Sequence, residues 1–497
     1  MAEQSLKQRT VSGMIWVGIQ KFGTLIITFI SNIILARLLT PDDYGMIGML
    51  AIFIAISNSF IDGGFGSALI QKTRPTETDY STVFYWNIFL SIVLYGLLCV
   101  SAPFIESFYH DIVGLAEILR IQGIVLIINA ITIVQFNKLR KAMNFKLLAW
   151  INVLGALISM LVAIVMALLN FGVWSLVIQQ IVFSLVNCIV LWVKCKWIPR
   201  REFSFVSLRE LFKFGSYMMG STLVNTIGNN VNGLIIGRWF SAGTLGYFTQ
   251  AKKLEDVSSV GLLTVVEQVT YPMLVEVKDD YHRMAIVLSK FNSALLGLTM
   301  PLLYGLILMA SPIIVFLFSA KWLPSAPILQ ILAVHGIFIC MQGANYNAIA
   351  AIGKSNTLFR WTMIKRCGGI LLMVGMMVLW GFSGLLWGIV LTGLLIALIN
   401  MYLVQKFIKF PFIDQIKGLL PVILITTMPF IIIYIIDYFL QNNIINSDNM
   451  NFSMDILMGF SYLLIVLCLL WYYPNKEIND LKITIIGLFK KRQSSRT

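Results

Sequence analysis

Two apolar stretches of this 497-residue sequence carry hydrogen-bonding side chains at helical spacing. In each stretch these residues recur every three or four positions, which places them on one face of a helix. The first set is Lys21, Thr24, Thr28 and Ser31, and the second is Asn225, Asn229 and Asn232. Hydroxyl, amide and ammonium groups in this pattern are suited to binding a polar ligand, and the cation suits a phosphate-bearing one. The pattern therefore indicates recognition rather than bond-making chemistry.

Ionisable residues inside apolar helices are candidate functional positions because a charge there costs about 2.5–3.5 kcal/mol on insertion scales. The main group is Lys252, Lys253, Glu255 and Asp256, in which Lys252 can pair with Asp256 one helical turn further on. This group is either part of a binding site or a self-neutralising structural pair. Lys21 is either a ligand for an anion or a side chain that reaches for the membrane surface.

The remaining charged candidates each have two possible interpretations. Lys365 and Arg366 either extend a cationic entrance or anchor their helix at the membrane surface. Asp62 precedes Gly63 and Gly64, so it either binds a coupling cation, as Glu255 and Asp256 also could, or belongs to a glycine-rich helix end.

Several kinds of chemistry have no motif in this sequence. Gly353-Lys354-Ser355 resembles part of a nucleotide-binding loop, but Ala348 stands where that loop needs glycine. No HExxH or GxSxG motif occurs, and the six cysteines lie singly in apolar runs without ligand spacing. We therefore expect no enzyme activity, no metal site and no cofactor.

The composition predicts the elements that position these residues. Apolar residues make up 58% of the chain and charged residues 12%, whereas soluble domains have about 45–50% and about 25%. Because a helix needs about 20 apolar residues to cross a bilayer, we expect an all-α polytopic membrane protein with about 14 transmembrane helices. The expected spans start near Gly13, Tyr44, Ser81, Leu115, Leu147, Val173, Phe212, Thr244, Met284, Ser325, Leu358, Gly384, Ile416 and Met454.

The net charge of +14 follows from the placement of the 37 lysines and arginines. If the spans alternate from an inside N-terminus, 30 of these residues fall on the inside. The exceptions are Arg37, Arg120, Arg238 and Lys321 outside, with Lys21, Lys252 and Lys253 within spans. The positive-inside rule thus explains the basic charge without a nucleic-acid partner and predicts that both termini are cytoplasmic.

An internal repeat sets the expected architecture. Arg37 and Gly45 match Arg238 and Gly246 at an offset of 201 residues, and later matches have offsets of 209 and 213. At the first offset the two polar faces coincide, so we expect both to line a hydrated cleft between parallel halves. Interhelical hydrogen bonds in a closed bundle are the alternative. The expected parts are residues 1–197 (spans 1–6), 198–410 (spans 7–12), 411–475 (spans 13 and 14) and a basic cytoplasmic tail, 476–497.

Several short motifs make the chain similar to a known group of transporters. They are Leu35-Ala36-Arg37-Leu-Leu-Thr-Pro41-Asp-Asp-Tyr44-Gly45, Asp62-Gly-Gly-Phe-Gly66-Ser-Ala-Leu-Ile-Gln71, Tyr85-Trp86-Asn87 and Gln135-Phe136-Asn-Lys-Leu139-Arg-Lys141-Ala-Met-Asn-Phe145. Through them the sequence resembles the polysaccharide exporters of the multidrug, oligosaccharidyl-lipid and polysaccharide flippase superfamily, and most of all their colanic-acid and teichuronic-acid exporter type.

The resemblance implies a function for the polar faces. It implies a flippase of the inner membrane that carries an undecaprenyl-pyrophosphate-linked oligosaccharide from the cytoplasmic to the outer leaflet for surface polysaccharide synthesis. It also implies membrane lipids, a glycan polymerase and a chain-length protein as partners. A cation-coupled multidrug antiporter of the same superfamily is the alternative, although such a carrier would normally need an acidic cavity. A membrane glycan polymerase or ligase is a further alternative, but the short outside loops disfavour it.

Overall fold

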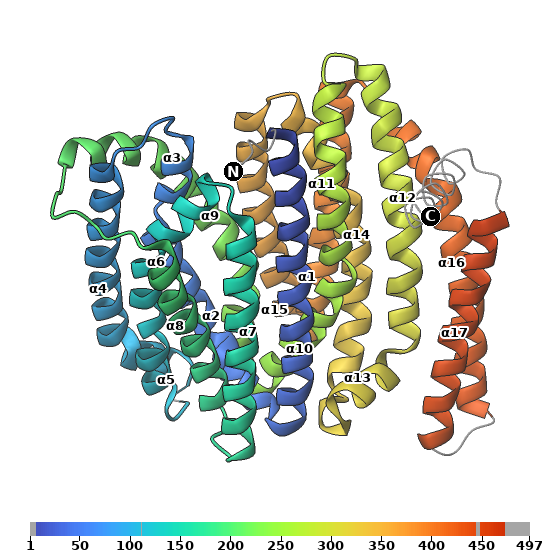
Figure 1. Cartoon of the computed structure of the whole chain (residues 1–497). Coiled ribbons are helices and arrows are strands. Elements are labelled where there is room, and N and C mark those ends of the chain that lie inside the picture. Colours follow the sequence, from blue (N-terminus) through green and yellow to red (C-terminus); the bar gives the residue numbers. More distant parts are fainter. Residues whose placement is uncertain (1–5, 111, 444–447, 473–497) are drawn as a thin grey trace, which may run out of the picture. The chain divides into compact units, whose positions relative to one another are not determined.

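The computed structural model describes residues 6–110, 112–443 and 448–472, and these residues form helices and loops without a strand (Figure 1). The N-terminal helices are α1 (Leu6–Leu38), α2 (Pro41–Asp62), α3 (Phe65–Gln71), α4 (Glu77–Phe108), α5 (Leu115–Gln122), α6 (Ile124–Lys141), α7 (Phe145–Leu168), α8 (Trp174–Cys195) and α9 (Phe205–Trp239). The later helices are α10 (Ala242–Ser258), α11 (Val260–Glu276), α12 (Tyr281–Leu308), α13 (Ala310–Phe318), a 3₁₀ turn (Ala320–Trp322), α14 (Ser325–Ala351), α15 (Ser355–Ile408), α16 (Phe412–Asn443) and α17 (Asp448–Tyr472).

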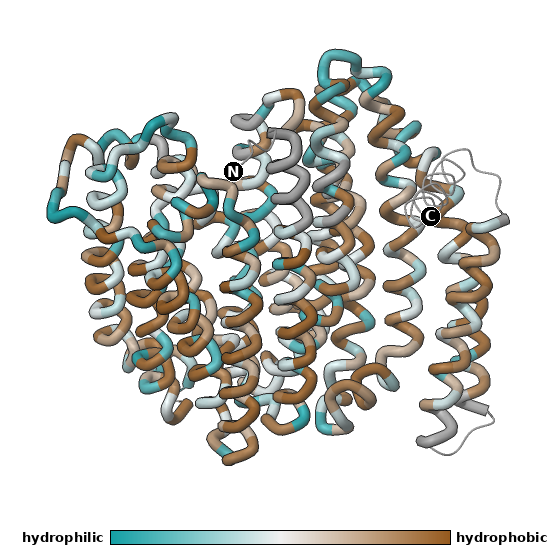
Figure 2. Tube along the Cα trace, in the orientation of Figure 1, coloured by the Kyte–Doolittle hydropathy of each residue, from teal (hydrophilic) through white to brown (hydrophobic). Residues whose placement is uncertain are grey.

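The helices have the lengths and compositions of membrane spans. Within the described part of the chain, 11 helical segments are long and apolar enough to cross a bilayer. One of them, Arg360–Ile408, is broken by the non-helical residues Trp380 and Gly381 and therefore supplies two crossings. The expected spans near Phe212 and Thr244 fall on α9 and on the consecutive pair α10 and α11, which are not among these 11 segments. Figure 2 shows apolar residues along the helices and hydrophilic residues gathered at many helix ends. The expectation of an all-α polytopic membrane protein is confirmed.

The chain divides into two compact units, Met1–Gly246 and Tyr247–Thr497. In the first unit α7 packs on α1 and α8, α4 packs on α6, and α9 packs on α2. In the second unit α14 packs on α12 and α15, and α16 packs on α12 and α17. The domain boundaries expected from the repeat, including residue 197, stay predictions, and the expected tail, 476–497, lies outside the described residues.

Each unit has its own apolar core. A core cluster of the first unit surrounds Phe65 and Phe84 and extends to Trp197, in the loop after α8. In the second unit one cluster lies around Leu296 and another around Leu288, both on α12. Since these cores fix the helices within each unit, polar side chains on the helices are held in defined positions.

Two short sequence signals set where helices of the first unit begin. Thr40 and Thr76 each accept a hydrogen bond from the backbone N–H three residues later. The Asp43 and Asp79 carboxylates in turn accept a hydrogen bond from the backbone N–H of Thr40 and Thr76, respectively. These capping boxes satisfy backbone donors that a helix start otherwise leaves unpaired.

A reciprocal contact joins the starts of α2 and α10. A Cβ atom added to Gly45 would lie 1.9 Å from the backbone oxygen of Ala242, and a Cβ on Gly246 would lie 1.9 Å from the backbone oxygen of Pro41. The two glycines are 201 residues apart, and so are Pro41 and Ala242. The residues that match in the repeat thus contact one another reciprocally, and only glycine fits at either position.

Candidate functional site

The polar residues of α1 have two different environments. Lys21 and Thr28 are exposed, and Thr24 is half-buried. Both threonine hydroxyls donate to a carbonyl one turn earlier, Thr24 over 2.6 Å and Thr28 over 2.8 Å, so their oxygens keep acceptor capacity on the helix surface. Ser31 differs, because it is 1% exposed and accepts a hydrogen bond of 2.8 Å from Gln179 on α8. The open polar face of α1 therefore runs from Lys21 to Thr28.

The polar residues of α9 lie mainly on an exposed face. Asn225 and Asn229 are exposed, whereas Asn232 is half-buried and its Oδ1 has no hydrogen-bond partner among the described residues. Their neighbour Thr226 points the other way, and its hydroxyl lies 3.0 Å from the Ser59 hydroxyl of α2. One face of α9 thus binds α2, while Asn225 and Asn229 stay accessible.

Asp62 ends α2 beside a tight backbone turn. Gly63 and Gly64 both have positive φ, at 51° and 70°, so α2 stops there and α3 starts in a new direction. Asp62 is half-buried, and a Cβ on Gly66 would lie 3.1 Å from its Oδ1. The expected helix end is confirmed, and the carboxylate lies in a close-packed site.

The second unit contains the predicted charged group of α10. Lys252 pairs with Asp256 over 2.7 Å, which confirms the predicted i,i+4 pair, and it also pairs with Glu255. Glu255 is completely buried and accepts a 2.6 Å hydrogen bond from Ser259. A Cβ on Gly336 of α14 would lie 2.7 Å from Oε1 of Glu255. Lys252 thus neutralises carboxylates within its own helix, while Lys253 is exposed.

Lys365 is a buried cation in the second unit. It is 7% exposed and donates a 2.6 Å hydrogen bond to Oδ1 of Asn400, whose amide lies 3.4 Å from the Gln342 carbonyl. The next residue, Arg366, is half-buried. Lys365 therefore links the two halves of α15, which lie on either side of the break at Trp380 and Gly381.

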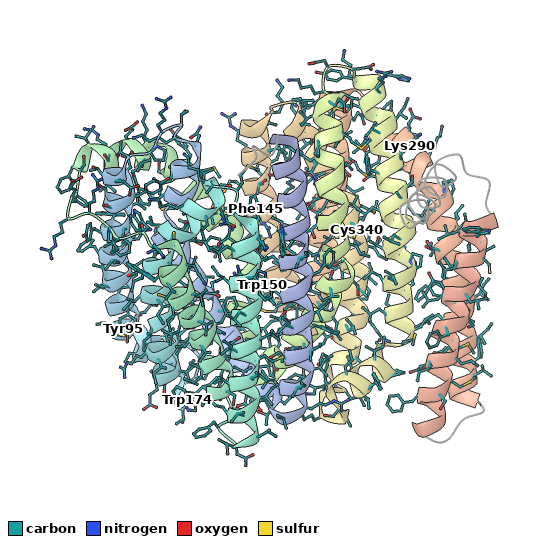
Figure 3. All side chains as sticks on the ribbon, viewed as in Figure 1. Tyr95, Phe145, Trp150, Trp174, Lys290 and Cys340 are labelled. Atoms are coloured by element: carbon teal, nitrogen blue, oxygen red, sulfur yellow. The ribbon has the colours of Figure 1, made fainter. Side chains whose placement is uncertain are left out.

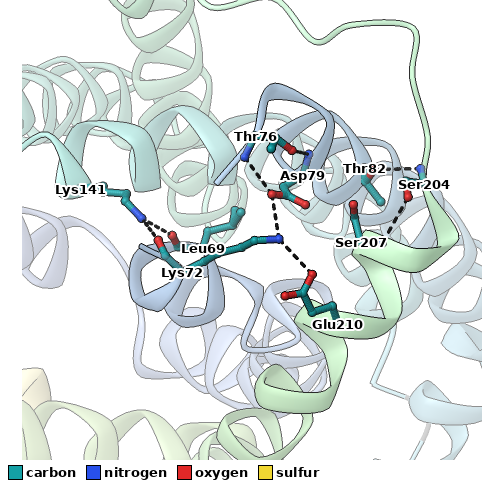
Figure 4. A network of polar contacts seen from close by, with 9 residues as sticks. All are labelled: Leu69, Lys72, Thr76, Asp79, Thr82, Lys141, Ser204, Ser207 and Glu210. Carbon is teal, nitrogen blue, oxygen red and sulfur yellow. Dashed lines mark hydrogen bonds and ion pairs between the residues drawn. The ribbon is translucent and has the colours of Figure 1, made fainter. Parts of the chain in front are cut away.

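A network of charges at one end of the first unit was not predicted from the sequence. Lys72 forms ion pairs of 3.1 Å with Asp79 and 3.0 Å with Glu210 (Figure 4). Burial acts to lower the pKa of Lys72, but hydrogen bonds to Glu210 and Asp79 outweigh it, so the pKa is raised above its ordinary value. Lys141 donates to the backbone oxygens of Leu69, Ile70 and Lys72.

A second ion pair extends this network. Lys138 lies 2.8 Å from Glu77, and the indole N–H of Trp197 donates to the same carboxylate over 2.6 Å. The Lys138 ammonium lies 4.5 Å from the centre of the Tyr80 ring. The sequence offers little sign of this network, because Glu210 lies 138 positions from Lys72 and Glu77 lies 61 positions from Lys138.

Taken by unit, the structure groups only some of the predicted residues. It brings Lys252, Glu255 and Asp256 together and connects Lys365 with Asn400. In the first unit it leaves exposed polar faces on α1 and α9 and uses Ser31 for internal packing. These groups can donate and accept hydrogen bonds and present positive charge, which suits binding of a polar, anionic molecule.

Comparison with known proteins gives three kinds of match. A family model described as "Polysaccharide biosynthesis protein" matches residues 34–327. The teichuronic acid biosynthesis protein TuaB of Bacillus subtilis (strain 168) is 26% identical over 408 residues, which are 82% of each chain. The succinoglycan biosynthesis transport protein ExoT of Rhizobium meliloti (strain 1021) is 26% identical over 355 residues, covering 70% of this chain and 71% of that protein.

The fold also matches a solved structure. The lipid II flippase MurJ, in an inward closed conformation, aligns with a TM-score of 0.73 at 18% identity, covering 92% of this chain and 99% of that chain. The arrangement of helices is therefore shared with that protein.

Proposed function

Because the chain belongs to the polysaccharide biosynthesis protein family, whose model matches residues 34–327, we propose that it is a flippase for a lipid-linked oligosaccharide. The protein would take a polyprenyl-pyrophosphate-linked glycan from the cytoplasmic leaflet and present it at the outer leaflet for polysaccharide synthesis. Movement of its helices would expose the binding site to the two sides of the membrane in turn, and the substrate would cross by this alternating access.

The relatives support this class of substrate. One is named for teichuronic acid biosynthesis, and another is named as a transport protein of succinoglycan biosynthesis. The protein that shares the fold at a TM-score of 0.73 is named as a lipid II flippase. A carrier of polysaccharide precursors fits all three names, and the family gives no reason to expect catalysis.

The observation in the structure that carries the proposal is the exposed polar face of α9. Asn225 and Asn229 lie on a helix of 35 residues, long enough to cross a bilayer. Polar side chains exposed on a membrane-crossing helix are disfavoured against lipid tails, so this face of α9 is better placed against water or a polar ligand. Sugar hydroxyls are such partners. We place these asparagines on the substrate path, together with Lys21, Thr24 and Thr28 of α1.

The charged residues have separate proposed roles. Lys253, Lys365 and Arg366 would add positive potential for the pyrophosphate, while Lys252 balances Glu255 and Asp256. Because those two carboxylates already have a cation, Asp62 is the better candidate for a coupling ion. We further propose an inner-membrane location with both termini cytoplasmic, and a glycan polymerase and a chain-length protein as partners.

The proposal is tested by deleting the gene in its host and measuring lipid-linked oligosaccharides and surface glycan by mass spectrometry. We expect lipid-linked units to accumulate while surface glycan falls, and the wild-type gene to restore export. The Asn225→Ala/Asn229→Ala variant should fail to restore export although it is made and inserted. As a matched control, Asn152→Ala on α7 should restore it, because that amide already bonds to its own helix at the Leu148 carbonyl.

A different outcome would replace the proposal. If the deletion leaves lipid-linked units unchanged and raises sensitivity to cationic drugs, the protein is a multidrug antiporter, and Asp62 becomes the residue to substitute first.

A further inference from the structure

A cavity opens at one end of the helix pair α7 and α8 in the first unit. Its volume is about 430 Å³, and its lining includes the first residues of α7 and the last turn of α8. Because α7 packs directly against α8, the start of one and the end of the other lie at the same end of the pair. None of the residues proposed for the substrate path lines this cavity.

Among the residues that the structure describes, the lining contains two lysines and no carboxylate. Lys146 comes from α7 and Lys194 from α8, and both side chains are exposed. The Lys146 ammonium lies 5.5 Å from the centre of the Trp16 ring, a contact that positions the cation without neutralising it. The Asn144 side chain accepts the Leu147 N–H at the start of α7, where the helix dipole is positive. The charge of the lining therefore favours an anion.

The rest of the lining is apolar and continues along the membrane-facing surface. Trp150, 61% exposed, and Leu154, 40% exposed, lie one turn apart on α7, and Figure 3 shows Trp150 on this helix. The same face continues with the exposed residues Leu157 and Leu161, at spacings of three and four. A tryptophan beside lysines at a helix end is typical of the boundary between headgroups and hydrocarbon. An acyl chain would fit along this face.

We infer that the cavity is a binding site for an anionic phospholipid. The two lysines would hold the headgroup phosphate, Trp150 would lie at the glycerol level, and an acyl chain would follow Leu154 along α7. A free phosphate would leave the apolar lining uncovered. A zwitterionic headgroup would place its own ammonium beside the ammonium groups of Lys146 and Lys194. This site does not depend on the proposed function, since no residue of the substrate path contributes to it.

The test is native mass spectrometry of the purified full-length protein titrated with phosphatidylglycerol or phosphatidylethanolamine. We expect phosphatidylglycerol to bind at least roughly 10-fold more tightly. A lysine near the surface contributes on the order of a 5-fold gain, so Lys146→Gln/Lys194→Gln should bind roughly 30-fold more weakly. The matched control, Arg209→Gln/Lys213→Gln, removes two exposed cations outside the cavity and should bind as the wild type does.

Three further measurements test the inference. Leu154→Trp fills the cavity without changing its charge and should also abolish tight binding. Equal losses in the control and in the lysine variant would overturn the inference, because they would indicate general charge attraction. Full competition by inorganic phosphate would overturn the lipid assignment, and so would binding of a polyprenyl phosphate in place of phosphatidylglycerol.

Discussion

Replacing Gly45 or Gly246 by alanine should force apart the starts of α2 and α10. Each new Cβ would lie 1.9 Å from a backbone oxygen, whereas ordinary contacts begin at 3.4 Å. The helices must therefore separate by about 1.5 Å at this point. Since the obstacle at each position is backbone rather than a flexible side chain, rotation of a side chain cannot relieve the overlap.

The magnitude follows from two opposing effects. Overpacking of this kind costs about 1–3 kcal/mol, and a rigid obstacle favours the upper end. Alanine recovers about 1 kcal/mol because it is a better helix former than glycine. We expect each single variant to lose about 2 kcal/mol. The double variant should lose only about 1 kcal/mol, less than either single variant, because one separation of the helices relieves both overlaps while each alanine adds its own helix-forming gain.

The assay is thermal unfolding of the detergent-solubilised protein, followed by tryptophan fluorescence. The control is Gly96→Ala on α4, where nothing lies within 4 Å of the added Cβ, and this variant should be as stable as the wild type or more so. If Gly45→Ala unfolds at the same temperature as Gly96→Ala, the close approach is refuted. Strictly additive losses in the double variant would refute the reciprocal geometry.

Other predictions concern the caps and charges. Thr76→Ala removes the acceptor for the Asp79 N–H and should cost about 1 kcal/mol in the same unfolding assay; an unchanged midpoint would contradict the capping role. Lys252→Met leaves the buried Glu255 without its main cation and should lower the free energy of unfolding by on the order of 3 kcal/mol. Substituting methionine for both residues should recover that stability. A Lys252→Met variant as stable as the wild type would argue against the ion pair. The pKa of Lys72 is raised in the folded protein, so its stabilising charge is fully present below the unfolded pKa of 10.5 and is lost as the pH rises through the folded pKa. The difference in stability between the wild type and Lys72→Met should therefore be constant from about pH 7 to 9. A decline within that range would contradict the ion pairs.

The helices could be predicted closely because long apolar runs alternate with charged loops. The expected starts at Leu115 and Ser325 are the first residues of α5 and α14. The expected starts at Leu358 and Gly384 separated the two crossings within α15, and the break at Trp380 and Gly381 lies between them. The offset of 201 residues was readable, but the contact that it produces between Gly45 and Gly246 is a tertiary feature.

The candidate site was predictable only where partners are close in sequence. Lys252 and Asp256 are four residues apart, so helical spacing was sufficient to pair them. The bond from Gln179 to Ser31 joins residues 148 positions apart, and Lys72 meets Glu210 across 138 positions. A periodic pattern defines a helix face but does not say which neighbour covers it, so Ser31 could not be separated from the open face of α1.

The polarity of α9 also bears on how the protein enters the membrane. This helix is not among the segments apolar enough to cross a bilayer by composition. Its transfer from water into the bilayer would therefore release little free energy unless it also packs on other helices. Its packing partners α2, α3 and α4 all precede it in the chain and are synthesised first. The helices that α9 packs on are therefore made before α9 itself. A circular permutant that begins at α9 would deliver this helix before its partner exists, and it should insert poorly even though its finished fold would be the same.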